Sequence, residues 1–375
     1  MRIAVVASFA PSLVNFRGPL LRSLAEQGHE LHTFAPDADP KTEAQPRAWG
    51  ITHHTIPLNR NGTRPQDDLR TLYALQRAFR KIQPEVVFTY TVKPVVWGTL
   101  AATLARVPRR VAMVTGLGHA FIESDQRRSY VAQVVRNLYR VALTFADCVI
   151  FHNQDDRALF EGDKLVPSDG RAVVVHGSGV DLEHFQARPL PALPLRFLLI
   201  ARLLGEKGIH EYVDAARIVK ARHPDVEFRL VGPPDTNPSG ISEAQAQAWD
   251  AEGVLRYVGA VQDVREELAG CHVYVLPSYR EGLPRTNLEA MATGRPVITT
   301  DVPGCRDTVE EGVNGFLVEV RNAQSLADAC LRFIEDASLL EPMRLASRAK
   351  AEASFGLEPV NRAMRAYITN QAESA

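Results

Sequence analysis

Short apolar runs alternate with amphipathic stretches along most of the chain. Residues 3–7 form an apolar run that predicts a buried strand, and residues 18–27 have the spacing of a helix that Gly28 can end. The alternation predicts further strands at 30–34, 85–90, 110–115, 147–152 and 172–176, with helices at 67–81, 95–105 and 129–145. Repeated strand–helix units are typical of parallel sheets that helices cover on both faces.

A proline-rich stretch at 188–194 interrupts this alternation, which then restarts. The second half predicts strands at 196–201, 227–231, 255–258, 273–276, 296–299 and 316–318. At 375 residues the chain is too long for one typical core and suits two. We therefore expect an α/β protein with two doubly wound domains, 1–185 and 186–358, that face each other across a cleft. Residues 359–375 are expected to form a helix that packs back toward the N-terminal domain.

The predicted helix at 129–145 carries an apolar stripe on one face, made of Tyr130, Val131, Val134, Leu138, Val141, Ala142 and Phe145. Arg136 and Arg140 lie off that face. We interpret the stripe as the core-facing side of an ordinary amphipathic helix. Docking on a membrane surface through the basic edge is the alternative interpretation.

Charge is distributed unevenly along the chain. The net charge is −1, but residues 1–183 sum to +4 and residues 184–375 to −5. A basic N-terminal half favours an anionic partner such as a lipid diphosphate or a membrane surface, whereas nucleic acid is not indicated.

The cysteines and the first apolar run bear on the compartment. The four cysteines are scattered without a C-x-x-C pair, which argues against a zinc site or a disulfide framework and fits a reducing cytosol. No run reaches the ~18 apolar residues that predict a membrane span. The first residues superficially resemble a signal peptide, but Pro11 interrupts the run and a helical pattern follows. We expect a cytoplasmic protein.

Two glutamates flank a predicted turn from strand to helix. Glu281 lies in the loop after the strand at 273–276, and Glu289 is expected in the first turn of the following helix. Open α/β sheets bind ligands at such turns, and a helix start attracts anions. Carboxylates for hydroxyl groups and a helix start for phosphate indicate a nucleotide-sugar pocket. A capping box from Thr286 to Glu289 is the structural alternative for Glu289.

The residues EGLPRTNLEAMATGRPVITTDVPG from 281 onward, continued by EEGVNGF at 310–316, resemble the nucleotide-sugar motif of the GT4 family of retaining glycosyltransferases. The resemblance covers almost the entire chain and implies the GT-B fold. It implies that Glu281 and Gly282 contact the transferred sugar and that Glu289 binds the ribose hydroxyls. Thr286 and Asn287 would lie at the donor diphosphate.

Arg202 and Lys207 follow the strand at 196–201. Fixed cations aimed at a departing diphosphate stabilise the transition state, although spacing alone would equally fit two solvated loop cations. The residues ARLLGEKG resemble the R-x4-K diphosphate clamp of the same family. Since such a clamp needs no metal, we expect neither metal nor cofactor. The tripeptide Asp37-Ala38-Asp39 is interpreted as a solvated turn.

The N-terminal half offers residues for the acceptor. His119 follows two glycines after the strand at 110–115, and the resemblance implies that it supports the reacting centre together with Glu281. The family's glycine-rich loop after the first strand is absent here. The segments around Asn15, Arg17 and Lys93 resemble the branch that adds amino sugars such as N-acetylgalactosamine to undecaprenyl-diphosphate saccharides. These three residues are candidate acceptor contacts, although each could equally be a surface group.

The resemblance implies transfer of an N-acetylhexosamine from a UDP-sugar to a lipid-diphosphate-linked saccharide in surface glycan biosynthesis, with retention of configuration. Such an acceptor also implies peripheral association with the inner face of the cytoplasmic membrane. Two alternatives stay open at this point: a UDP-sugar epimerase of similar architecture, and a catalytically silent nucleotide-sugar-binding partner.

Overall fold

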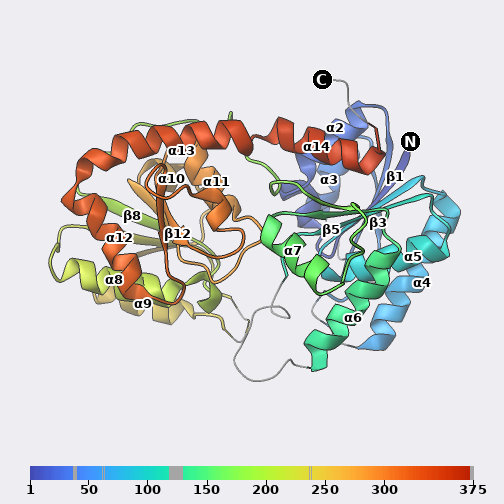
Figure 1. The fold of residues 1–375 in the computed structure, drawn as a ribbon, viewed down its shortest axis with the longest axis horizontal. Coiled ribbons are helices and arrows are strands. Elements are labelled where there is room, and N and C mark those ends of the chain that lie inside the picture. The colour runs from blue at the N-terminus through green and yellow to red at the C-terminus, as the bar shows by residue number, and fades with distance from the viewer. Residues whose placement is uncertain are drawn as a thin grey trace. The chain divides into compact units, whose positions relative to one another are not determined.

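The computed structural model describes residues 1–36, 40–60, 62, 64–117, 130–235, 237 and 239–371. It divides into two compact units, one of Met1–Ser178 with Glu358–Ala375 and one of Gly179–Leu357 (Figure 1). Each unit contains one parallel sheet with helices on both faces, which is the α/β architecture that the alternating pattern predicts.

The sheet of the first unit has seven parallel strands in the order β3-β2-β1-β4-β5-β6-β7. Strand β1 (Arg2–Val6) lies inside the sheet and is almost fully buried, so the apolar run at the start of the chain is a core strand. The other strands are β2 (Glu30–Ala35), β3 (Thr52–Thr55), β4 (Val86–Tyr90), β5 (Arg109–Val114), β6 (Cys148–Phe151) and β7 (Ala172–Val174).

Helices cover both faces of this sheet. One core joins α1 (Pro11–Asn15), α2 (Gly18–Glu26) and α14 (Leu357–Thr369) to one face. The other face packs against α4 (Pro65–Ile82), α5 (Thr99–Leu104), α6 (Tyr130–Thr144) and α7 (Gln154–Gly162). A short α3 (Pro40–Ala48) precedes β3, and a π-helical turn (Pro94–Gly98) precedes α5.

Helix α14 is separated from the rest of the first unit by the whole second unit in sequence. Its Val360, Met364 and Ile368 belong to the buried core beneath β1 and β4. The Arg109 guanidinium donates to the carbonyls of Tyr367 and Ile368, at 2.7 Å and 3.1 Å. The last helix is therefore an integral part of the N-terminal sheet's packing.

The prediction for the apolar stripe of α6 was wrong for three of its members, whereas its Ala142 is buried. Val134, Val141 and Phe145, the residue just after the helix, are exposed, and the helix instead turns Tyr139 and Leu143 into the core. Both sides of this helix are apolar, so periodicity alone did not distinguish the buried face. No helix in the described ranges is both long and apolar enough to cross a bilayer.

The sheet of the second unit has six parallel strands in the order β10-β9-β8-β11-β12-β13. The strands are β8 (Arg196–Ile200), β9 (Glu227–Val231), β10 (Arg256–Gly259), β11 (Val273–Leu276), β12 (Val297–Thr300) and β13 (Gly315–Val318). The helices are α8 (Ile209–Lys220), α9 (Glu243–Ala251), α10 (Arg265–Ala269), α11 (Arg285–Ala292), α12 (Ala323–Glu335) and α13 (Leu340–Ser354). Separate apolar cores lie on the two faces, one with α8 and α12 and the other with α11.

Candidate functional site

The strand order of the second unit places the predicted donor residues at a topological switch point. The chain runs from β8 outward through β9 to β10, and then returns to β11 on the other side of β8. The loops that leave the carboxyl ends of β8 and β11 therefore diverge and leave room for a ligand. Lys207 lies in the first of these loops and Glu281 in the second.

Two glycines allow close approach to the loop after β11, Gly208 from the loop after β8 and Gly304 from the loop after β12. Gly208 has φ +71°, and a Cβ added there would lie 2.0 Å from the Pro277 carbonyl oxygen. Gly304 has φ +79°, and its Cβ would lie 2.4 Å from the Glu281 carbonyl oxygen. Because any side chain at either position would collide with backbone, these glycines permit the loops after β8 and β12 to approach the loop after β11.

Lys207 and Glu281 form the centre of the site. The Lys207 ammonium donates to Glu281 Oε1, and the Ser278 hydroxyl lies 2.8 Å from the same oxygen. The two charged side chains are only 24% and 15% exposed. A partly buried ion pair of this kind presents a cation and a carboxylate side by side, which suits a ligand that combines phosphate with sugar hydroxyls.

Arg202 has a different partner from the one that its clamp role implied. Its guanidinium donates to Asp235 Oδ2 at 2.7 Å and is 56% exposed. The Asn237 backbone N–H and then Arg202 hold the pKa of Asp235 below its usual range. Sequence reasoning missed Asp235 because it lies 33 residues away, in the loop after β9.

The start of α11 excludes the capping box. The N-cap is Pro284, without any side-chain cap, so Thr286 is the second residue of the helix. Glu289 is the fifth residue and lies in the second turn, not in the first as predicted. The Arg285 Nε donates to Glu289 Oε1 at 3.1 Å, one turn earlier on the same side of the helix. Glu289 therefore does not close the helix on Thr286.

Glu289 is a buried carboxyl within reach of one cation. Burial raises the pKa of Glu289, and the Arg285 guanidinium partly opposes this shift. A carboxylate in this setting gains from additional hydrogen-bond donors, which ligand hydroxyls can supply.

Asn287 lies on the inner side of α11. It is completely buried, and its Nδ2 donates to Thr308 Oγ1 at 2.8 Å. Within the described residues its Oδ1 has no hydrogen-bond partner. The side chain joins α11 to the turn at Arg306–Thr308, whereas Thr286 is only partly buried.

Tyr279 links the loop after β11 to α8 and was not identified from the sequence. Its hydroxyl donates to Glu211 Oε1 at 2.7 Å, and Arg321 lies over its ring at 4.7 Å from the centroid. Burial and the neighbouring Glu211 raise the pKa of Tyr279 to about 12. Its backbone N–H also donates to the Glu206 carbonyl at 2.9 Å. No local motif marks this set, since its members come from three separate segments.

The residues predicted for the acceptor lie in the first unit. Arg17 is buried, lies 5.4 Å from the centroid of the Tyr90 ring and places a guanidinium nitrogen 2.9 Å from Met113 Sδ. Lys93 donates to Asp68 Oδ1 at 2.7 Å and to a backbone carbonyl. Asn15 is exposed at the end of α1. His119 and the tripeptide Asp37-Ala38-Asp39 lie outside the described residues.

Further polar groups that the sequence did not single out follow β1, β4 and β6, and one of them contacts Arg17. His152 follows β6, with Nε2 3.4 Å from the Arg17 guanidinium. Burial and then Arg17 lower the pKa of His152 to about 3, so the imidazole is neutral at ordinary pH. At the end of β4, Thr91 has φ +68°, a strained value for a β-branched residue, and its hydroxyl lies 2.8 Å from Ser8 Oγ. These groups lie at the carboxyl ends of the strands, the usual functional edge.

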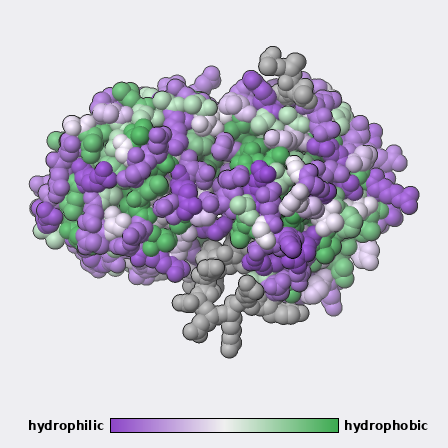
Figure 2. Space-filling view, viewed as in Figure 1, coloured by the Kyte–Doolittle hydropathy of each residue, from purple (hydrophilic) through white to green (hydrophobic). Residues whose placement is uncertain are grey.

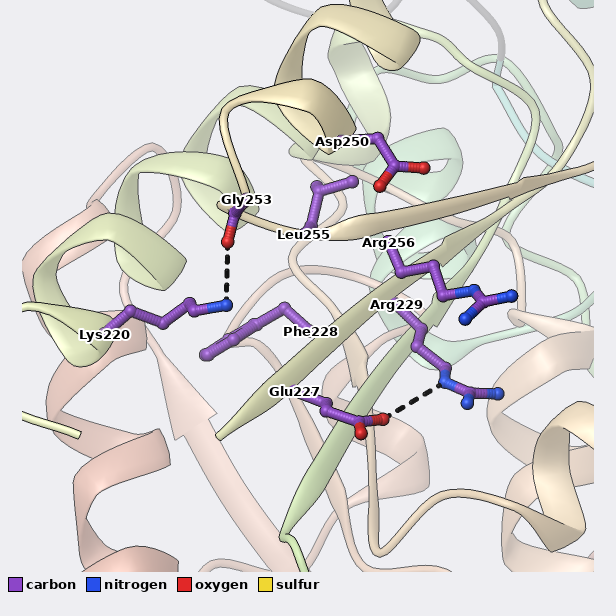
Figure 3. Close-up of a pocket in the computed structure, with 8 residues that line it drawn as sticks. All are labelled: Lys220, Glu227, Phe228, Arg229, Asp250, Gly253, Leu255 and Arg256. Atoms are coloured by element: carbon purple, nitrogen blue, oxygen red, sulfur yellow. Dashed lines mark hydrogen bonds and ion pairs between the residues drawn. The ribbon is translucent and has the colours of Figure 1, made fainter. Parts of the chain in front are cut away.

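Figure 3 shows a pocket of about 230 Å³ at the opposite end of the C-terminal sheet. Its lining includes Glu227 and Arg256, the first residues of β9 and β10, together with Lys220 at the end of α8. None of the predicted site residues lines it. Among the residues that the structure covers, no group of three or more histidine, cysteine or acidic side chains could hold a metal ion.

Two family models match the chain, one to each half. Residues 2–153 match the model described as glycosyl transferase 4-like, and residues 194–336 match the model for glycosyl transferases group 1. The second match contains the whole Lys207–Glu281 region.

Curated relatives and solved structures agree with this result. The N,N'-diacetylbacillosaminyl-diphospho-undecaprenol alpha-1,3-N-acetylgalactosaminyltransferase of Campylobacter jejuni is 28% identical over 94% of both chains. The UDP-Gal:alpha-D-GlcNAc-diphosphoundecaprenol alpha-1,3-galactosyltransferase of Escherichia coli is 28% identical over 72% of this chain and 71% of its own.

Anabaena HepE, solved in complex with UDP, has a TM-score of 0.78 at 20% identity and covers 99% of this chain and 100% of its own. The sucrose-phosphate synthase of Thermosynechococcus elongatus has a TM-score of 0.81 at 20% identity, over 99% and 98%. Both likenesses establish the fold. Matching family models in both halves, relatives along the full length and two parallel sheets together show that the chain belongs to the GT4-like glycosyltransferases and has the GT-B fold.

Proposed function

We propose that this glycosyltransferase moves an N-acetylhexosamine from a UDP-sugar to an undecaprenyl-diphosphate-linked saccharide, with retention of configuration. The observation that carries the proposal is the contact between Lys207 and Glu281 at the switch point of the C-terminal sheet, beside the start of α11. The substrate class is supported by the full-length similarity to the Campylobacter jejuni enzyme, whose name specifies such an acceptor. In this proposal the enzyme works at the inner face of the cytoplasmic membrane.

The donor diphosphate is assigned to the start of α11 and to Lys207. Backbone N–H groups at the start of a helix have no acceptor in a preceding turn, and the helix dipole adds positive potential there. Lys207 supplies a full charge that is partly shielded from water. Arg202 is exposed enough to reach the same phosphates, provided that it exchanges its contact with Asp235.

The transferred sugar is assigned to Glu281 and Gly282. With Lys207 turned to the diphosphate, the Glu281 carboxylate can accept hydrogen bonds from sugar hydroxyls, while Ser278 holds its orientation. The buried Glu289 is assigned to the ribose hydroxyls.

The reaction needs charge stabilisation more than proton transfer by a side chain. The bond between the anomeric carbon and the diphosphate oxygen breaks, and the acceptor hydroxyl oxygen forms the new bond on the same face. Its proton passes to the departing diphosphate oxygen. Lys207 stabilises the charge that develops on this leaving group, and His119 is assigned to support the reacting centre. Asn15, Arg17 and Lys93 are assigned to the acceptor.

UDP release from a panel of UDP-sugars tests the proposal, with and without an undecaprenyl-diphosphate monosaccharide. We expect release that depends on the acceptor and is strongest with a UDP-N-acetylhexosamine, and an α-linked product by NMR. Interconversion of UDP-sugars without UDP release would support an epimerase. Donor binding without turnover, for every acceptor tried, would support a silent binding protein.

A further inference from the structure

Tyr279 contacts the chain on both sides of Lys207. Its backbone N–H donates to the Glu206 carbonyl at 2.9 Å, and its hydroxyl donates to Glu211 Oε1 at 2.7 Å. Glu206 is the residue just before Lys207, and Glu211 lies in the first turn of α8. The loop after β11 therefore holds the short segment that carries Lys207 from both ends.

The Glu211 carboxylate depends on the Tyr279 hydroxyl for its hydrogen bonding. Among the described residues, Glu211 Oε2 is buried without a hydrogen-bond partner, and Oε1 accepts from Tyr279. A hydrogen bond to a carboxylate is strong because the acceptor is charged. Burial and then Glu211 raise the pKa of Tyr279 to about 12, so the hydroxyl keeps its proton and remains a donor at ordinary pH.

The Tyr279 ring is held by a third segment. The Arg321 guanidinium lies over it at 4.7 Å from the ring centroid, within the range at which a cation is attracted to the face of an aromatic ring. Arg321 lies between β13 and α12 and has φ +58°, a strained value for a residue other than glycine. Contacts of its backbone, its ring and its hydroxyl therefore fix Tyr279 in place.

The inner side of α8 is apolar, and its outer side is polar. Ile209 and Val213 are buried in one core of the second unit. The surface over α8 is mostly hydrophilic in Figure 2, and the exposed residues of this helix are His210, Asp214 and Arg217. Apolar packing is not directional, whereas a hydrogen bond is. The bond from Tyr279 to Glu211 therefore adds a directional contact at the turn that follows Lys207.

We infer that Tyr279 is a positioning residue that holds the Lys207 ammonium at the donor diphosphate, and this inference rests on the proposed donor site. In that site Lys207 turns from Glu281 to the diphosphate. A lysine side chain is flexible, so the place that its ammonium reaches depends on the backbone beneath it. Tyr279 fixes this backbone and acts on the donor only through Lys207.

Calorimetric titration with UDP and with uridine, without any acceptor, separates positioning from a purely structural role. The test variant is Tyr279→Phe, which keeps the ring beneath Arg321 and removes only the hydroxyl. Tyr212→Phe is the matched control, because the Tyr212 hydroxyl donates to the Arg229 carbonyl at 3.0 Å within the same unit. Urea denaturation measures the stability of each variant.

We expect Tyr279→Phe to weaken UDP binding about fivefold, the size of one hydrogen bond, and to leave uridine binding unchanged. Tyr212→Phe should lower the stability without changing the ratio of the two affinities. In a Lys207→Gln background, Tyr279→Phe should weaken UDP binding no further, because the cation that Tyr279 positions is absent.

Equal losses of UDP and uridine affinity in Tyr279→Phe would overturn the inference, as would additive losses in the double variant with Lys207→Gln. Weak UDP binding in Lys207→Gln with normal binding in Tyr279→Phe would overturn the inference and leave the proposed donor site in place. Normal UDP binding in Lys207→Gln would contradict the proposed donor site, and the inference would fall with it.

Discussion

In the C-terminal unit, two residues predicted for the donor contact each other. In the N-terminal unit, the residues predicted for the acceptor each contact different protein groups. Lys207 and Glu281 meet where Gly208 lets the loop after β8 approach the loop after β11. In the N-terminal unit, Arg17 lies against Tyr90 and Met113, and Lys93 forms an ion pair with Asp68. The residues proposed for the donor therefore include a pair in direct contact, whereas Arg17 and Lys93, proposed for the acceptor, have separate protein partners. The difference predicts that donor binding is strong and independent, and that acceptor residues affect only the second substrate.

Charge reversal at Lys207 should cause the largest loss of activity. Lys207→Glu places two carboxylates together and removes the cation beside the leaving group, so kcat/KM should fall by about 10³-fold or more. Steady-state UDP release measures this loss. Lys220→Glu is the matched control, since Lys220 lies at the other end of α8, at the pocket in Figure 3. Near-normal turnover of the Lys207 variant would contradict the assignment of Lys207 to the donor diphosphate.

Loss of the close loop approach should be nearly as damaging. In Gly208→Ala the new methyl group collides with the Pro277 carbonyl and shifts the loop that carries Lys207. We expect the free energy of unfolding to fall by about 2–3 kcal/mol and UDP affinity to fall with it. Urea denaturation and calorimetry measure the two effects.

Gly253→Ala separates backbone strain from collision in that experiment. Gly253 also has a positive φ of +73°, but no atom lies within 4 Å of the added Cβ. This variant should lose about 1 kcal/mol and keep its UDP affinity. Equal losses in both variants would mean that the close approach of the loops has no special role.

Donor binding should depend on the ionisation of Glu289. Burial raises the pKa of this carboxyl, so it takes up a proton at a higher pH than an ordinary glutamate. As pH falls through the raised pKa, the carboxylate loses acceptor capacity for ribose hydroxyls, and UDP affinity should fall about tenfold. Glu289→Gln should bind UDP weakly at every pH, without the fall in affinity at acid pH. Glu335→Gln, which changes an exposed site, should keep the fall in affinity at acid pH. If the UDP affinity of Glu289→Gln still falls at acid pH as in the intact protein, a group other than Glu289 is responsible for the pH dependence.

The smallest effect is expected in the N-terminal unit. Lys93→Gln removes an ion pair whose side chains are mostly buried and removes one candidate contact to an acceptor phosphate. KM for the acceptor should rise severalfold while Kd for UDP is unchanged, because the residues proposed for the donor lie in the other unit. A change in UDP affinity, measured by calorimetry, would contradict the proposal that the two units bind donor and acceptor separately.

Sequence patterns predicted most of the fold because the buried parallel strands are nearly continuous apolar runs. The strand β3 was missed because its sequence, Thr-His-His-Thr, has no apolar residue. It is an edge strand held by polar contacts, with the His54 ring 3.1 Å from His32 Nδ1 on β2 and stacked on Phe34. Such a strand is specified by its neighbours, which local patterning does not reveal.

The same distinction holds for the site. Glu281, Glu289 and Lys207 lie in recognisable local motifs, and the structure places Lys207 on Glu281. The pairing of Arg202 with Asp235 and of Tyr279 with Glu211 depends on loops far apart in sequence. Periodicity also assigned the exposed Val134 and Val141 to the buried side of α6, because both sides of that helix are apolar and only packing decides between them.

The most direct test of the central claim compares UDP with uridine by calorimetric titration in the intact protein and in Lys207→Glu. If Lys207 and the start of α11 hold the diphosphate, the intact protein should bind UDP at least 100-fold more tightly than uridine. The variant should bind both ligands with the weak affinity of uridine. Equal UDP affinity in the two proteins would contradict the assignment of the donor diphosphate to this site.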